Sequence, residues 1–226
     1  VGNFDDDEYP EIVLVNNGRV WILEHNGDIK VGPVSIPGGG RGGPPTVADF
    51  NQDGKVEIGV AGQAKYSVFT GNGDILWAVD ISDYSSHYTG SSVFDFEGDG
   101  AYEVVYRDEQ YLRIYRGMDG EVLYELPMTS LTIFEYPVIA DVDSDGNAEI
   151  VACANGTISG IYVIGDANDT WVNTRKIWNQ HAYSITNIND DGTIPEIPDT
   201  NWTIYNNFRC NQAPHANACV DLSASF

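Results

Sequence analysis

A nine-residue acidic pattern recurs five times in this chain at a constant period, and it constrains the fold more than any other feature. Its copies are NFDDDEYPE from Asn3, DFNQDGKVE from Asp49, DFEGDGAYE from Asp95, DVDSDGNAE from Asp141 and NINDDGTIP from Asn187. Each copy starts 46 residues after the one before it. A fixed period without insertions indicates one structural unit per repeat, and four full units are present.

Short apolar segments follow each acidic loop in the same order. In the second unit they are EIGVA from Glu57, YSVFT from Tyr66 and ILWAVDI from Ile75, and SSVFDF from Ser91 leads into the next loop. Four short β-rich segments per unit, separated by turn residues, predict one four-stranded blade. We therefore expect an all-β chain, a β-propeller or part of one, over residues 1–209.

The two ends of the chain depart from the repeat. The first loop follows only Val1 and Gly2, so the strand before it is truncated and we expect further blades upstream. A small closed propeller, or closure by a neighbouring chain, is the alternative. Asn201 to Phe208 predicts at most two strands, and Val220 to Ala224 alternates like the start of a following β domain, so residues 210–226 are expected to form a separate tail.

Oxygen-bearing side chains occupy alternate positions of each loop. Positions 1, 3 and 5 hold Asn3, Asp5 and Asp7; Asp49, Asn51 and Asp53; Asp95, Glu97 and Asp99; Asp141, Asp143 and Asp145; and Asn187, Asn189 and Asp191. Position 9 holds Glu11, Glu57, Glu103 and Glu149, and Glu196 comes one residue late in the fifth loop. Position 7, which would contribute a backbone carbonyl, holds Tyr9, Lys55, Ala101, Asn147 and Thr193.

This ligand pattern predicts calcium. Side-chain oxygens at alternate positions, with a Gly at position 6 that permits positive φ, suit a hard cation that takes six to eight oxygen ligands. Zinc fits less well because no nitrogen or sulfur ligand is near, and magnesium because it keeps several waters. An EF-hand is excluded, since its position-12 glutamate is replaced by Leu14, Val60, Tyr106, Ala152 and Pro198.

A solvated acidic turn without metal is the competing interpretation of each loop. This metal-free interpretation is strongest for the first loop, where Glu8 replaces Gly, and for the fifth, where Pro195 stands at position 9. In loops two to four, the fixed period and the distal glutamate favour metal binding.

The chain is strongly acidic, with 34 Asp and Glu against 11 Lys and Arg and a net charge of −23. Such a balance argues against nucleic acid and anionic lipid as partners, because no basic surface exists to release their counterions. A cationic or neutral partner is expected. No apolar run reaches the length of a membrane span.

The three cysteines lie in two different settings. Cys210 and Cys219 flank a polar stretch, where a local disulfide would hold a loop and would place the protein outside the cytoplasm. Cys153 lies in an apolar run and is expected to be a buried free thiol.

The repeats resemble the FG-GAP/VCBS family of calcium-binding propeller repeats, which also form the head of integrin α-subunits. The DxDxDGxxE motif matches at Asp49 to Glu57, Asp95 to Glu103 and Asp141 to Glu149. The segment from Arg175 to Glu196 also looks like the last blade of such modules in large secreted bacterial surface proteins. The resemblance implies an extracellular or cell-surface propeller, usually of seven blades.

The loops that enter each blade should lie opposite the acidic loops, because one strand separates them. They carry residues suited to sugar stacking or protein contacts, namely Arg41, Tyr84, His87, Tyr88, Glu135, Trp178, His181 and Tyr183, although ordinary loop packing explains them as well. We expect a non-catalytic module for adhesion or for carbohydrate or protein binding. A structural subunit that pairs with copies of itself is the first alternative. A polysaccharide lyase-like enzyme is the second and rests on fold analogy alone.

Overall fold

Antiparallel β structure dominates the computed structural model, which describes residues 1–5, 7–131, 133–157 and 159–212. The strands are β1 (Ile12–Asn16), β2 (Arg19–Leu23), β3 (Ile29–Ser35), β4 (Thr46–Ala48), β5 (Glu57–Ala61), β6 (Lys65–Phe69), β7 (Ile75–Asp80), β8 (Ser92–Phe94), β9 (Glu103–Arg107), β10 (Tyr111–Tyr115), β11 (Val122–Pro127), β12 (Val138–Ala140), β13 (Glu149–Asn155) and β14 (Ser159–Ile164). A 3₁₀ turn (Ile185–Asn187) and a short helix α1 (Asn201–Ile204) follow. The prediction of an all-β chain is confirmed.

The strands form one sheet per repeat. The second and third sheets have the four strands expected, in the orders β4-β5-β6-β7 and β11-β10-β9-β8. The first sheet (β1-β2-β3) and the last (β12-β13-β14) have three strands in the described part of the chain. Before β1, only a bridge between Gly2 and Glu11 forms. After β14, the segment GDANDTWVNT lacks an apolar run that could pair as a strand.

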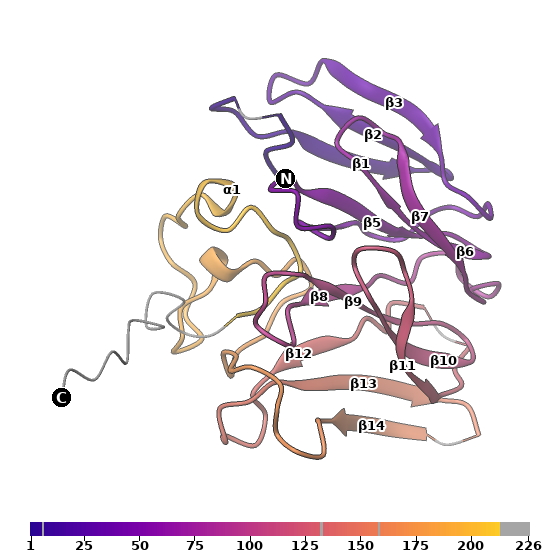
Figure 1. Ribbon diagram of the computed structural model, residues 1–226, viewed down its shortest axis with the longest axis vertical. Coiled ribbons are helices and arrows are strands. Elements are labelled where there is room, and N and C mark those ends of the chain that lie inside the picture. Colours follow the sequence, from indigo (N-terminus) through magenta and orange to yellow (C-terminus); the bar gives the residue numbers. More distant parts are fainter. Residues whose placement is uncertain (6, 132, 158, 213–226) are drawn as a thin grey trace.

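Successive sheets stack face against face in chain order, as Figure 1 shows. Alternate residues of one strand pack into two different hydrophobic cores, because side chains in a strand alternate between its faces. In β9, Val104 and Tyr106 pack against the second sheet, whereas Val105 packs against the fourth. Each fully buried Val or Ile stabilises the stack by about 1.5–3 kcal/mol.

The segment from residue 206 to residue 212 crosses the first strands of three sheets. Phe208 exchanges backbone hydrogen bonds with Val47 of β4, and the Arg209 carbonyl accepts from Val93 of β8 at 3.0 Å. The Asn211 side-chain amide donates to the Ile139 carbonyl of β12 at 2.8 Å. In Figure 1 this yellow region lies beside β8 and β12, on the side of the chain where the N-terminus is marked.

Two expectations for local structure are corrected. Residues 201–204 form α1 rather than a strand. Cys153 is free, as expected, but exposed, because its face of β13 is the outer face of the last sheet and no described segment covers it. The alternation expected at Val220 to Ala224 lies outside the described residues. None of the helices in the described part of the chain has the length and apolar character needed to cross a membrane.

Candidate metal centres and ligand pockets

The acidic loops share one backbone geometry, built by the carboxylate at position 5. In all five loops this group accepts a hydrogen bond from the backbone N–H at position 7. The N···O distances are 2.7 Å at Asp7, 2.9 Å at Asp53, 2.8 Å at Asp99, 2.8 Å at Asp145 and 2.9 Å at Asp191. Between these positions, Gly54, Gly100, Gly146 and Gly192 have φ from 83° to 102°, as the motif predicts.

The glutamate at position 9 closes each of the first four loops. Its Oε2 accepts a hydrogen bond from the backbone N–H at position 2, at 2.7 Å in Glu11, 2.8 Å in Glu57, 3.1 Å in Glu103 and 2.9 Å in Glu149. All four side chains are buried. Glu57, Glu103 and Glu149 are the first residues of the non-edge strands β5, β9 and β13, and Glu11 directly precedes β1. The carboxylate is therefore held at the base of its loop.

In loops two to four, this glutamate meets two further acids of the same loop. The three groups are Asp49, Asp53 and Glu57; Asp95, Glu97 and Glu103; and Asp141, Asp143 and Glu149. Within each group, one carboxylate oxygen per residue lies within 4.8 Å of the others. The sequence motif predicted each of these nine residues as a ligand, and the fold brings each set of three together.

The pKa values of the buried glutamates reflect the burial and the charge repulsion within these clusters. Burial raises the pKa of Glu57 to about 7, and repulsion from Asp53 and Asp49 adds to the effect. Burial also raises the pKa of Glu103 and of Glu149, where neighbouring carboxylates again contribute. Each cluster therefore favours a cation, because a positive charge would offset both the burial and the repulsion.

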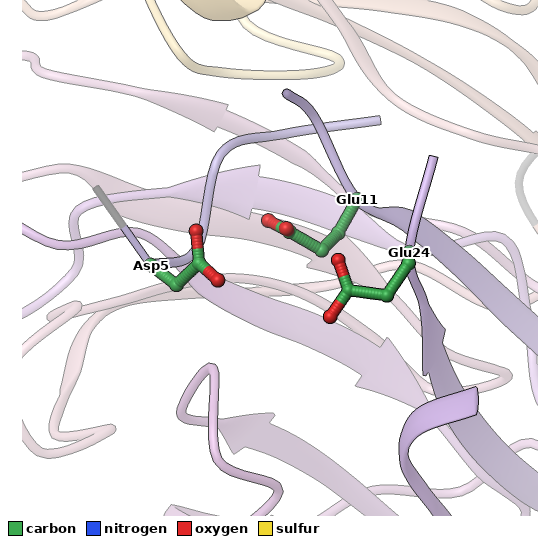
Figure 2. A group of neighbouring side chains, drawn as sticks. All are labelled: Asp5, Glu11 and Glu24. Carbon is green, nitrogen blue, oxygen red and sulfur yellow. The ribbon is translucent and has the colours of Figure 1, made fainter. Parts of the chain in front are cut away.

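The first loop has a different composition, shown in Figure 2. Its cluster consists of Asp5 and Glu11, which the motif predicted, and Glu24 at the end of the first hairpin, which it did not. The Lys30 ammonium contacts all three: it hydrogen-bonds to Asp5 and, at 3.1 Å, to Glu11, and its nitrogen lies 3.7 Å from Glu24. Neither Lys30 nor Glu24 lies within the nine-residue motif.

The fifth loop gathers no group of three acids among the residues that the structure describes. The Asn187 amide is held by Ala182, Ser184 and Gln180. Asn189 donates to the Thr193 hydroxyl, and that hydroxyl donates to Asp191. Glu196 is exposed.

The remaining predicted ligands lie in the loops but outside the clusters of acids. The Asn51 amide donates to Glu57 at 3.1 Å, so it lies beside the second cluster. The side-chain amides of Asn3 and Asn147 donate hydrogen bonds to the backbone carbonyls of Asp7 and Asp169, respectively. Asp7, Asp99 and Asp145 hold the loop backbone as described above, and Tyr9, Lys55 and Ala101 donate the position-7 N–H.

An aromatic pocket forms where two of the blade-entry loops meet. Its volume is about 230 Å³, and its lining residues are Phe134, Tyr136, Val138, Trp178, Asn179, Gln180, His181 and Arg209. The Tyr136 and His181 rings meet edge to face at 4.5 Å. The Arg209 guanidinium lies 5.1 Å from the Tyr136 ring centre and 5.3 Å from that of Trp178. The structure thus brings the predicted residues Trp178 and His181 together.

A second pocket of about 400 Å³ lies between the first hairpin and the next entry loops. It is lined by Val15, Asn16, Asn17, Arg41, Gly42 and Tyr88. Arg41 donates a hydrogen bond to the Tyr88 hydroxyl at 2.8 Å, so these two predicted residues also meet.

The other predicted entry-loop residues have structural contacts. Glu135 pairs with the buried Arg107 at 2.6 Å. Tyr183 is fully buried, stacks on Trp178 at 4.3 Å and donates to Asn211. Tyr84 is exposed, and its backbone carbonyl lies 3.0 Å from a His87 ring nitrogen.

The predicted disulfide involves a residue that is not described. Cys210 is buried and free among the described residues, and burial raises the pKa of its thiol. Cys219 lies outside them, so the pairing stays a prediction.

Comparisons with known proteins support the repeat assignment. Residues 3–60 match the family model described as FG-GAP-like repeat. The V. cholerae biofilm matrix protein Bap1 is similar in structure, with a TM-score of 0.66 and 27% sequence identity over 87% of this chain. This chain spans 34% of the length of that Bap1 structure.

Two further structural likenesses are weaker. A protein of unknown function from Bacteroides caccae has a TM-score of 0.43 at 12% identity, covering 89% of this chain and 81% of its own. BBS1N, solved in complex with ARL6DN, has a TM-score of 0.49 at 11% identity, covering 76% of this chain and 54% of its own. A search of curated protein sequences finds no match.

Proposed function

We propose that this chain, which carries an FG-GAP-like repeat at residues 3–60, is a calcium-stabilised, non-catalytic β-propeller module that serves adhesion outside the cell. The carrying observation is the recurrence of three acidic clusters, each closed by a buried glutamate, in a chain similar over 87% of its length to a biofilm matrix protein. The stacked sheets, three of which have a short strand (β4, β8 or β12) before their acidic loop, support the propeller assignment.

Calcium suits these clusters because their donors are all oxygens. Asp49, Asp53 and Glu57 would hold one ion, and the corresponding acids of loops three and four would hold two more. The bound ion would supply the positive charge that each buried carboxylate group lacks. Since the loop joins the first strand of a sheet to the second, a filled site would stiffen both strands.

The aromatic pocket is the proposed adhesion site, with a saccharide as ligand. Phe134 offers an exposed ring for the apolar face of a sugar, and Asn179 offers an amide for its hydroxyls. Because the chain carries a net charge of −23, a neutral saccharide suits it better than a polyanion.

A glycan array on the calcium-loaded protein tests this site. The Phe134→Ala variant should lose binding to every glycan that the wild-type protein binds on the array, because this exposed ring lines the pocket. Tyr84→Ala is the matched control, since Tyr84 is also exposed but lines neither pocket. Retained binding by Phe134→Ala, or an equal loss in Tyr84→Ala, would count against this pocket.

Self-assembly is a second candidate function, favoured by the outer face of the last sheet. Ile161 and Val163 of β14 are 73% and 56% exposed. The residues in the same register of the third sheet, Leu112 and Ile114, are 0% and 5% exposed because the fourth sheet covers them. A sheet of a second copy would cover Ile161 and Val163 in the same way.

Size measurement against protein concentration tests self-assembly. Ile161→Asp should abolish any concentration-dependent association, whereas Ile197→Asp, at an exposed position outside the sheets, should leave it unchanged. A wild-type protein that stays monomeric at all concentrations rules out this second function.

A further inference from the structure

The first acidic loop contains a cation that belongs to the chain itself. The Lys30 ammonium lies among Asp5, Glu11 and Glu24, hydrogen-bonded to the first two. The Lys30 side chain is 18% exposed, and that of Glu11 is fully buried. The corresponding glutamates of the other loops, Glu57, Glu103 and Glu149, have no lysine or arginine within ion-pair distance among the described residues.

The position of Lys30 in its strand explains how a largely buried lysine reaches the glutamate of this loop; in the fourth loop, Lys176 lies 3.7 Å from Asp141 but is 61% exposed. Lys30 lies at a register shift of β3, between Ile29 and Val31. The same place in the second sheet, between Ile75 and Trp77, is Leu76, and in the third sheet, between Val122 and Tyr124, it is Leu123. The first repeat thus replaces an apolar residue by a cation that reaches its own acidic loop.

Two further differences accompany this lysine in the first repeat. Glu8 stands at position 6, where loops two to five have a glycine with positive φ. Glu24 adds an acid where the second repeat has Thr70 at the end of the corresponding hairpin strand. The first loop therefore differs from the others in its turn residue, its acids and its cation.

We propose that Lys30 is the built-in counterion of the first acidic loop, so that this loop holds its structure without calcium and loops two to four take up three ions per chain. The number of ions rests on the proposed function, but the role of Lys30 does not. An ammonium offers three hydrogen-bond donors and a fixed positive charge, which offset the burial of Glu11 and its repulsion from Asp5 and Glu24.

Thermal unfolding in EDTA tests the role of Lys30 separately from calcium. Lys30→Leu, which installs the residue of the second and third repeats, should lower Tm by about 4 °C or more. Lys65→Leu is the matched control because it removes a lysine from the exposed pair with Asp80, and it should change Tm by less than about 2 °C. Equal Tm values for the two variants in EDTA would overturn the proposal.

Calcium counting on the folded variants tests the number of ions. The wild type should bind three ions, and Asp5→Asn should still bind three, whereas Asp53→Asn should lose one. Loss of an ion in Asp5→Asn would show that the first loop holds calcium and would overturn the proposal. Failure of the wild type to bind calcium would refute the proposed function, while the EDTA comparison would still decide the role of Lys30.

Discussion

The side-chain amide of Asn206 pairs with the backbone of Asn3, 203 residues away in the sequence. The Asn206 Oδ1 accepts from the Asn3 N–H at 2.8 Å, and its Nδ2 donates to the Asn3 carbonyl at 2.8 Å. This pair fixes the start of the first acidic loop to the segment that crosses β4, β8 and β12. The segment from residue 206 to residue 212 therefore joins the first repeat to the first strands of the other three sheets.

Replacement of Asn206 by glycine tests this connection. Asn206 has φ of 46°, so Asn206→Gly removes the amide without backbone strain. Loss of two hydrogen bonds to a partly buried backbone should cost about 1–3 kcal/mol of the free energy of unfolding. Urea unfolding at a fixed calcium concentration measures this loss in the free energy of unfolding. The exposed Asp169, whose φ is 52°, provides the control Asp169→Gly, which should change stability by less than about 1 kcal/mol. A loss in Asp169→Gly as large as in Asn206→Gly would contradict the role given to the amide.

The sheets and acidic loops were predictable from sequence because their determinants are local. Alternating apolar residues, turn glycines such as Gly54 and the position-9 glutamates all lie within one 46-residue unit. Lys30 and Glu24 were missed because they reach the first cluster only through the register of the first sheet. The contacts of Asn206 and Arg209 join residues more than 100 positions apart, which no local pattern specifies. The exposure of Cys153 depends on what covers the last sheet, and an apolar run alone does not show that.

The metal-free protein should lose stability as pH rises. Burial raises the pKa of Glu57 from 4.5 to about 7, so the folded state binds this proton more tightly than the unfolded state. Stability from this group is thus fully present below about pH 4.5 and is lost as pH rises through about 7, by about 3 kcal/mol. Glu149 shifts in the same direction.

Thermal unfolding in EDTA between pH 5 and 8 measures this dependence. Glu57→Gln should make it shallower, because glutamine does not titrate, whereas Glu103 and Glu149 still do. Glu121→Gln, at an exposed acid of the surface pair with Arg116, should leave it unchanged. A Tm that rises with pH in EDTA would contradict the predicted sign.

Arg209 should contribute strongly to stability through the acceptors that it satisfies. Its guanidinium donates to the Ser91 carbonyl at 2.7 Å, to the Ser92 hydroxyl at 3.1 Å and to the His181 carbonyl. Arg209→Met would leave these groups without their donor and should lower the free energy of unfolding by more than about 3 kcal/mol. Arg209→Lys, which keeps the charge without the forked geometry, should recover only part of the loss. Urea unfolding that gives Arg209→Met within about 1 kcal/mol of the wild type would refute this role.

Calcium-dependent thermal unfolding tests the central claim most directly. A ligand at 100 times its Kd stabilises the folded state by about 2.7 kcal/mol per site, so three sites would add about 8 kcal/mol. We predict that Tm in saturating calcium exceeds Tm in EDTA by about 10 °C or more, with a smaller rise in magnesium. The same Tm in calcium and in EDTA, together with fewer than two bound calcium ions per chain by metal analysis, would contradict the account.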